Sequence, residues 1–88
     1  MKLKNQFVIN QVAGETVAVS VGNSTGGFNG YIKLNETGAF IFEKLKADIS
    51  REALIAAVLG EYPDATRQAA AESVDELLEK LEKADLLV

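Results

Sequence analysis

The feature that most constrains the fold is a change of periodicity within the stretch from Tyr31 to Leu45. In Tyr31–Leu34 alternate residues are aliphatic, as in a short strand with one buried face. From Glu36 onward apolar residues recur at three- and four-residue spacing, which is typical of an amphipathic helix. Asn35 stands at the switch as a candidate N-cap, and Glu36 places negative charge at the helix N-terminus. The sequence therefore predicts a strand that leads directly into a capped helix.

Two further strands are predicted before this stretch. Phe7–Val12 is rich in apolar and β-branched residues, which favour strands. Thr16–Val21 alternates valine with small or polar residues, which predicts a strand with one buried face. Between them, Ala13–Glu15 supplies a short turn in which Gly14 can take a positive φ. The sequence thus predicts a β-hairpin at the start of the chain.

The segment 22–30 contains four of the seven glycines and predicts a flexible loop before the third strand. A phosphate-binding role for this loop is disfavoured, because no Gly-Lys-Ser/Thr closes the run and no helix follows it directly. We expect Phe28 to anchor the loop on the body of the protein and Gly30 to lead into the third strand.

Three helices are predicted after the strands. The first covers about residues 36–47, the second begins after the N-cap Ser50 and stops at Pro63, and the third covers about residues 67–84. An apolar stripe runs along each of the last two helices, made by Leu54, Ile55, Val58, Leu59 and Tyr62 and by Ala70, Val74, Leu77 and Leu81. Glu76–Lys80 and Glu79–Lys83 are expected to pair on the surface of the third helix, and the apolar C-terminal residues are expected to fold back onto the core.

This order predicts an α+β fold, a three-stranded antiparallel sheet followed by three helices in a winged-helix-like arrangement, with the third strand at a sheet edge. We expect one soluble, cytoplasmic domain over residues 1–88, since no segment approaches the ~20 apolar residues of a membrane span. The chain has no cysteine and no histidine, which excludes disulfides, thiolate nucleophiles and the commonest general base. With 13 acidic and 9 basic residues its net charge is -4, which argues against nucleic-acid binding.

Several motifs together resemble the PqqD-like family. They are Ile32-Lys33-Leu34-Asn35-Glu36-Thr37-Gly38-Ala39 with the aromatic-aliphatic helix after it, Glu61-Tyr62-Pro63, the run from Ser73 to Leu81, and Asp85-Leu86-Leu87. The similarity covers nearly the whole chain, and the Leu-Asn step followed by Thr-Gly-Ala is its most specific part. The chain departs from the family at Ser73, where members often have Asp, and at Leu77, where they often have Phe.

The resemblance implies a non-catalytic adaptor without a cofactor or metal. In this family, the leader of a precursor peptide adds as a strand to the third strand, beside the third helix, and is presented to a modifying enzyme, commonly a radical S-adenosylmethionine (SAM) protein. The peptide-binding residues implied here are Tyr31, Ile32, Lys33, Leu34, Ala70, Ser73, Val74 and Leu77. An edge strand suits this role because its free N–H and C=O groups can pair with an extended peptide. The spacing of Val74 and Leu77 favours a core position over the groove, because it already completes the hydrophobic stripe. Lys33 is equally explained as a guard against edge-to-edge aggregation.

Three alternatives remain open from the sequence alone. A winged-helix DNA-binding domain needs a basic recognition helix, but the third predicted helix is mainly acidic. A homodimer through the same strand edge would compete with the peptide. An enzyme is disfavoured, because the carboxylates are spread along solvated helix faces without a nucleophile–base pair.

Overall fold

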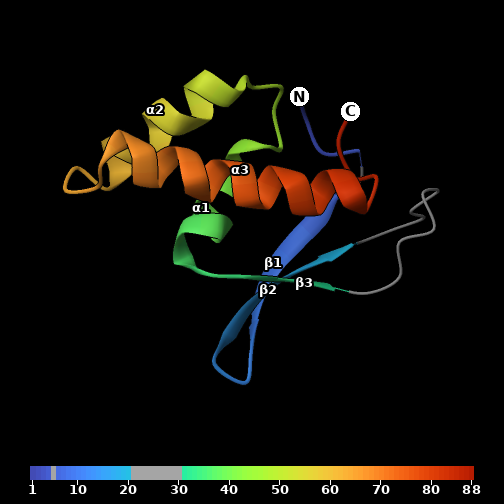
Figure 1. Ribbon diagram of the computed structural model, residues 1–88. Coiled ribbons are helices and arrows are strands. Elements are labelled where there is room, and N and C mark those ends of the chain that lie inside the picture. Colours follow the sequence, from blue (N-terminus) through green and yellow to red (C-terminus); the bar gives the residue numbers. More distant parts are fainter. Residues whose placement is uncertain (5, 21–30) are drawn as a thin grey trace.

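The structure of the protein is a computed structural model, and it describes residues 1–4, 6–20 and 31–88. The expectations for the glycine-rich segment, for Val21 and for Phe28 and Gly30 lie outside the described residues. The described residues form β1 (Phe7–Val12), β2 (Glu15–Ser20), β3 (Tyr31–Leu34), α1 (Glu36–Lys44), α2 (Arg51–Glu61) and α3 (Arg67–Lys83). The sheet is antiparallel in the order β1-β2-β3, and Figure 1 shows the helices on one side of it. The predicted α+β fold is confirmed.

The start of each helix is set by a polar side chain. Asn35 accepts a hydrogen bond from the Gly38 N–H at 2.7 Å, and Ser50 and Thr66 do the same for the N–H three residues later, each at 3.1 Å. These bonds satisfy backbone donors that have no partner within the helix. Asn35 and Ser50 were predicted as caps, and Thr66 caps the last helix.

The first helix ends at Lys44, earlier than the predicted residue 47. The Leu45 carbonyl accepts a hydrogen bond from the Leu3 N–H at 3.0 Å, and the Ile49 N–H donates to the Met1 carbonyl at 2.9 Å. The Leu45 carbonyl and the Ile49 N–H would bond to each other if α1 continued, but both are bonded to the N-terminal segment instead. These hydrogen bonds join segments that are far apart in the sequence, so the spacing of apolar residues near α1 could not predict where the helix ends.

The helices cover the side of the sheet that carries Phe7, Ala18, Ile32 and Leu34, all of which belong to the core. Because side chains alternate along a strand, Val17 and Val19 point to the opposite, outer face of the sheet. The face of β2 that the helices cover is therefore its face of small residues and not its valine face, although Val17 is also buried. Since α1 contacts the central strand, the small Ala18 side chain, with no exposed surface, permits this close approach.

The core lies between the sheet and the helices. Phe42 of α1 is its largest fully buried side chain and meets Phe7 of β1 edge-to-face, with ring centroids 5.2 Å apart. The other fully buried large side chains are Ile41, Leu45, Leu54, Ile55, Val58, Val74, Leu81 and Leu86. Both predicted helical stripes thus face the core, apart from the half-buried Leu59 and Tyr62.

The two ends of the described chain lie side by side (Figure 1). Leu3 and Leu87 form an antiparallel bridge, and the Lys4 N–H donates to the Leu86 carbonyl at 2.8 Å. Leu86 is buried, whereas Val88 is 75% exposed. The predicted return of the C-terminal residues is confirmed for Leu86. None of the helices in the described part of the chain is long and apolar enough to cross a membrane.

Replacing Ala13 with asparagine is expected to stabilise the protein by about 0.5–1 kcal/mol. The β1–β2 turn holds Ala13 at a φ of 52° and Gly14 at 81°, and a turn with two positive φ angles favours Asn-Gly. Urea denaturation of Ala13→Asn and of the parent chain measures the difference. The same change at the exposed helical position Ala56 should destabilise, because asparagine is a poorer helix former than alanine. An equal loss of unfolding free energy for asparagine at Ala13 and at Ala56 would contradict the prediction.

Candidate functional site

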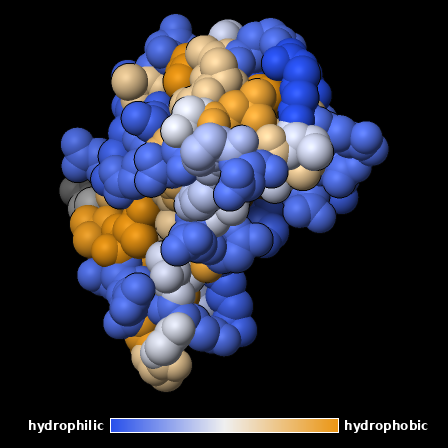
Figure 2. Space-filling model, turned by 90° about the vertical axis from the view of Figure 1, so that its left-hand side faces the viewer, coloured by the Kyte–Doolittle hydropathy of each residue, from blue (hydrophilic) through white to orange (hydrophobic). Residues whose placement is uncertain are grey.

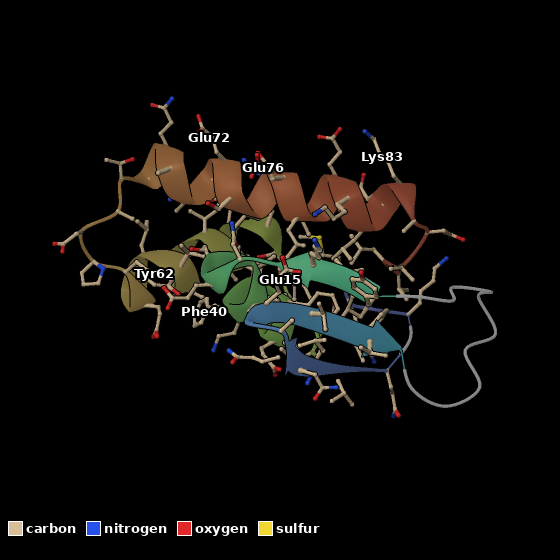
Figure 3. The ribbon with its side chains drawn as sticks, turned by 90° about the horizontal axis from the view of Figure 1, so that it is seen from below. Glu15, Phe40, Tyr62, Glu72, Glu76 and Lys83 are labelled. Carbon is tan, nitrogen blue, oxygen red and sulfur yellow. The ribbon has the colours of Figure 1, made fainter. Side chains whose placement is uncertain are left out.

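The most distinctive surface feature is a groove beside β3. Among the described strands only β2 pairs with β3, so the other side of β3 is a sheet edge. In Figure 3, β3 is the strand nearest α3, and in Figure 1 the two elements run in opposite directions. A shallow groove of about 270 Å³ lies here, lined by Lys33, Leu34, Asn35, Gly38, Ser73, Glu76, Leu77 and Lys80.

The structure brings together four of the eight residues that the family resemblance implied. Lys33 and Leu34 line the groove from β3, and Ser73 and Leu77 line it from α3. Leu34 and Leu77 belong to the core as well, whereas Ile32, Ala70 and Val74 are core residues that do not line the groove. Tyr31 is 59% exposed and lies beside a shallow depression of the outer sheet face, together with Val17 and Val19. The role of all eight residues in binding stays a prediction.

Four lining residues were not expected from the sequence: Asn35, Gly38, Glu76 and Lys80. Asn35 and Gly38 form the corner where β3 becomes α1. A Cβ atom on Gly38 would lie 3.0 Å from the Asn35 Oδ1 atom, so glycine permits the close cap hydrogen bond. The cap motif was visible in the sequence, and its position directly after β3 is the signal that could have placed it at the groove.

The groove carries charges of both signs. The Lys33 ammonium lies 3.3 Å from a carboxylate oxygen of Glu15, on the adjacent strand. On α3, Glu79 and Lys83 form the expected pair at 3.0 Å. Glu76 and Lys80 have the same spacing, but neither forms an ion pair with the other or with any further residue in the described part of the chain. Both charges therefore remain available at the groove.

An ion-pair clamp holds α3 against α2 away from the groove. The Arg51 guanidinium donates two hydrogen bonds to the Asp75 carboxylate, at 2.7 and 2.9 Å, and Arg67 pairs with Glu52. Such two-pronged geometry fixes orientation as well as distance. The hydrogen bond from Arg51 lowers the pKa of Asp75 below its ordinary value of 3.8. These ion pairs hold α3, which forms one wall of the groove, to α2 in addition to the contacts of the two helices in the core.

The Asp75→Asn variant is expected to be less stable than the parent chain at neutral pH, with a smaller difference in acid. Because the folded pKa of Asp75 is lowered, its stabilising contribution is present above the unfolded pKa and is lost as the pH falls through the folded value. Urea denaturation at about pH 7 and about pH 3 tests this. A difference of the same size at both pH values would contradict the prediction.

A free strand edge facing a helix across a shallow groove is the arrangement that domains use to bind an extended peptide as an added strand. The comparison with protein families identifies this chain more closely. The model of the family described as coenzyme PQQ synthesis protein D (PqqD) matches residues 15–87, so the chain belongs to the PqqD family. The resemblance seen in the sequence is thus confirmed.

Members of this family are non-catalytic accessory proteins. They act as peptide-binding partners in the biosynthesis of pyrroloquinoline quinone (PQQ) and of other ribosomally made, modified peptides. Neither the search of curated proteins nor the search of solved structures gave a match.

Proposed function

We propose that this protein is an adaptor that binds the leader of a precursor peptide as an additional strand on β3 and presents it to a modifying enzyme. The observation that carries the proposal is the position of the free β3 edge directly beside the groove. Membership of the PqqD family supports the peptide as the ligand class. The adaptor itself performs no chemistry on the peptide.

Binding rests on two contributions that act together. The backbone of the added strand pairs with the free edge of β3, which is largely independent of sequence. Side chains of the peptide that point toward α3 reach the groove, where Leu34 and Leu77 offer apolar surface and the small Ser73 leaves room. One or two apolar anchors at ~1.5–3 kcal/mol each, less the cost of ordering the peptide, predict affinity on the order of micromolar.

The partner enzyme in this proposal is a radical SAM protein, the class that commonly works with such adaptors in the family. An affinity near micromolar suits this role, because the peptide has to be passed on to the enzyme and released. The acidic surface of α3, with Glu72, Asp75, Glu79 and Glu82 exposed, weighs against nucleic acid as the partner.

An amide NMR titration of the ¹⁵N-labelled protein tests the proposal. The probe is a synthetic peptide that covers the N-terminal half of any short open reading frame found beside this gene. We expect the largest shifts in β3, in Asn35 and Gly38, and in the α3 residues Ser73 to Lys80. An unlabelled peptide of the same composition in scrambled order is the control.

Two outcomes would contradict the proposal. Shifts confined to surfaces away from β3 and α3 would place the ligand elsewhere. Absence of peptide shifts, combined with a concentration-dependent dimer signature on β3, would show that the edge serves self-association.

A further inference from the structure

The groove wall on α3 contains one unusual detail. Glu76 and Lys80 lie one helical turn apart, and both line the groove. Glutamate followed by lysine at this spacing normally pairs, as Glu79 and Lys83 do at 3.0 Å on the same helix. Yet Glu76 and Lys80 form no such pair within the described residues. They present a negative and a positive charge separately to whatever occupies the groove.

The remaining charge of the groove is already engaged. Lys33, on the opposite wall, lies 3.3 Å from Glu15. Leu34 and Leu77 are both less than 10% exposed and supply apolar surface between the walls. The groove therefore combines an apolar floor with two free, opposite charges on α3.

The spacing of these charges matches that of an extended chain. Four residues of helix advance by about 6 Å, so Glu76 and Lys80 are separated by this distance along α3. Two residues of strand advance by about 6.6–6.8 Å, and side chains at positions i and i+2 point to the same face. Two neighbouring helix-facing side chains of a bound strand can thus meet both charges at once.

The direction of the elements assigns the order of the two complementary charges. β3 and α3 run in opposite directions (Figure 1), so a strand that adds antiparallel to β3 runs in the same direction as α3. The sheet is antiparallel throughout, and antiparallel pairs are the more stable kind. The residue opposite Glu76 then comes first in the peptide, and the residue opposite Lys80 follows two positions later.

We propose that Glu76 and Lys80 are specificity-determining residues that select a peptide strand with a basic residue followed, two positions later, by an acidic residue on the helix-facing side. This inference rests on the proposed peptide-binding function and names the class of peptide that the groove takes. The charges set the register and direction of the strand, whereas the β3 edge and the apolar floor hold it in place. Reversing the order of the two peptide charges replaces two attractions by two repulsions.

Selection from a displayed library of short, randomised peptides tests the inference without knowledge of the natural ligand. Three proteins serve as targets: the parent chain, the double variant Glu76→Lys with Lys80→Glu, and the double variant Glu79→Lys with Lys83→Glu. Each double variant keeps the net charge and the i, i+4 spacing. The second one is the matched control, because Glu79 and Lys83 do not line the groove.

The parent chain and the control are expected to enrich basic-x-acidic peptides, and the groove variant acidic-x-basic peptides. For a selected peptide, exchange of its two charges should raise the Kd for the parent chain by about tenfold at low salt. The difference should shrink at about 1 M salt, where screening is strong.

The outcomes separate this inference from the proposed function. Selected peptides that shift the amides of β3 and α3, but show the same charge pattern on all three proteins, would overturn the inference and leave the adaptor function standing. The order acidic-x-basic on the parent chain would also overturn it, since it indicates a parallel strand. Failure to select any peptide that shifts these amides would overturn the proposed function and this inference together.

Discussion

Replacing Phe42 with alanine is expected to lower the free energy of unfolding by about 3–5 kcal/mol. Phe42 has no exposed surface, and it joins α1 to β1 through its edge-to-face contact with Phe7 at 5.2 Å. The alanine would leave a cavity that the sheet and three helices can fill only by moving together. Because domains of this size are stable by only about 5–15 kcal/mol, the loss should be a large part of the total and should be seen as an earlier urea midpoint.

Phe40 provides a matched control on the same helix. It is half-buried at the surface, where its ring meets Tyr62 with centroids 6.1 Å apart and lies under the Lys44 ammonium at 5.3 Å (Figure 3). Exposed contacts of these kinds contribute about 0.5–1.5 kcal/mol. The Phe40→Ala variant should therefore be clearly more stable than Phe42→Ala. Similar losses for both variants would show that the core is not centred on Phe42.

Replacing Ser73 with arginine is expected to weaken peptide binding by roughly 5- to 150-fold, which corresponds to about 1–3 kcal/mol of steric conflict. Ser73 lies on the wall of α3 and is one of the smallest side chains of the groove. A longer side chain there occupies the space that the added strand needs, while the core stays intact. Fluorescence anisotropy with a fluorescently labelled form of the peptide used in the NMR titration measures the Kd.

The Gln68→Arg variant is the control for Ser73→Arg. It introduces the same side chain and the same charge at an exposed position of α3 that does not line the groove. Binding should stay within about twofold of the parent value, since an exposed charge has a small effect. A folded Ser73→Arg variant that binds the peptide as well as the parent would place the ligand outside the groove.

Local signals in the sequence accounted for most of the secondary structure. The change of period after Leu34, the caps Asn35 and Ser50, and Pro63 at the end of α2 each act within a few residues. Such short-range interactions do not depend on the rest of the fold. The end of α1 was misjudged because Leu45 is capped by Leu3, which is distant in the sequence.

The groove was only partly predictable. Lys33 and Leu34 followed from the edge position of β3, and Ser73 and Leu77 from the family resemblance. Glu76 and Lys80 were read as an ordinary surface pair, because helical spacing shows which residues share a face but not which neighbour that face meets. The rotation of α3 against β3 depends on how its apolar residues, such as Val74 and Leu81, pack into the common core.

The sequence by itself determined the order of the elements, their caps and the class of fold, because these depend on periodicity and on hydrogen bonds between near neighbours. Only the tertiary structure decided which face of the sheet the helices cover. The alternation of side chains along β2 places Val17 and Ala18 on opposite faces of the sheet, but it does not determine which of these faces the helices cover. Packing of α1 across the central strand selected the side of Ala18, because a small side chain allows the closest contact between helix and sheet.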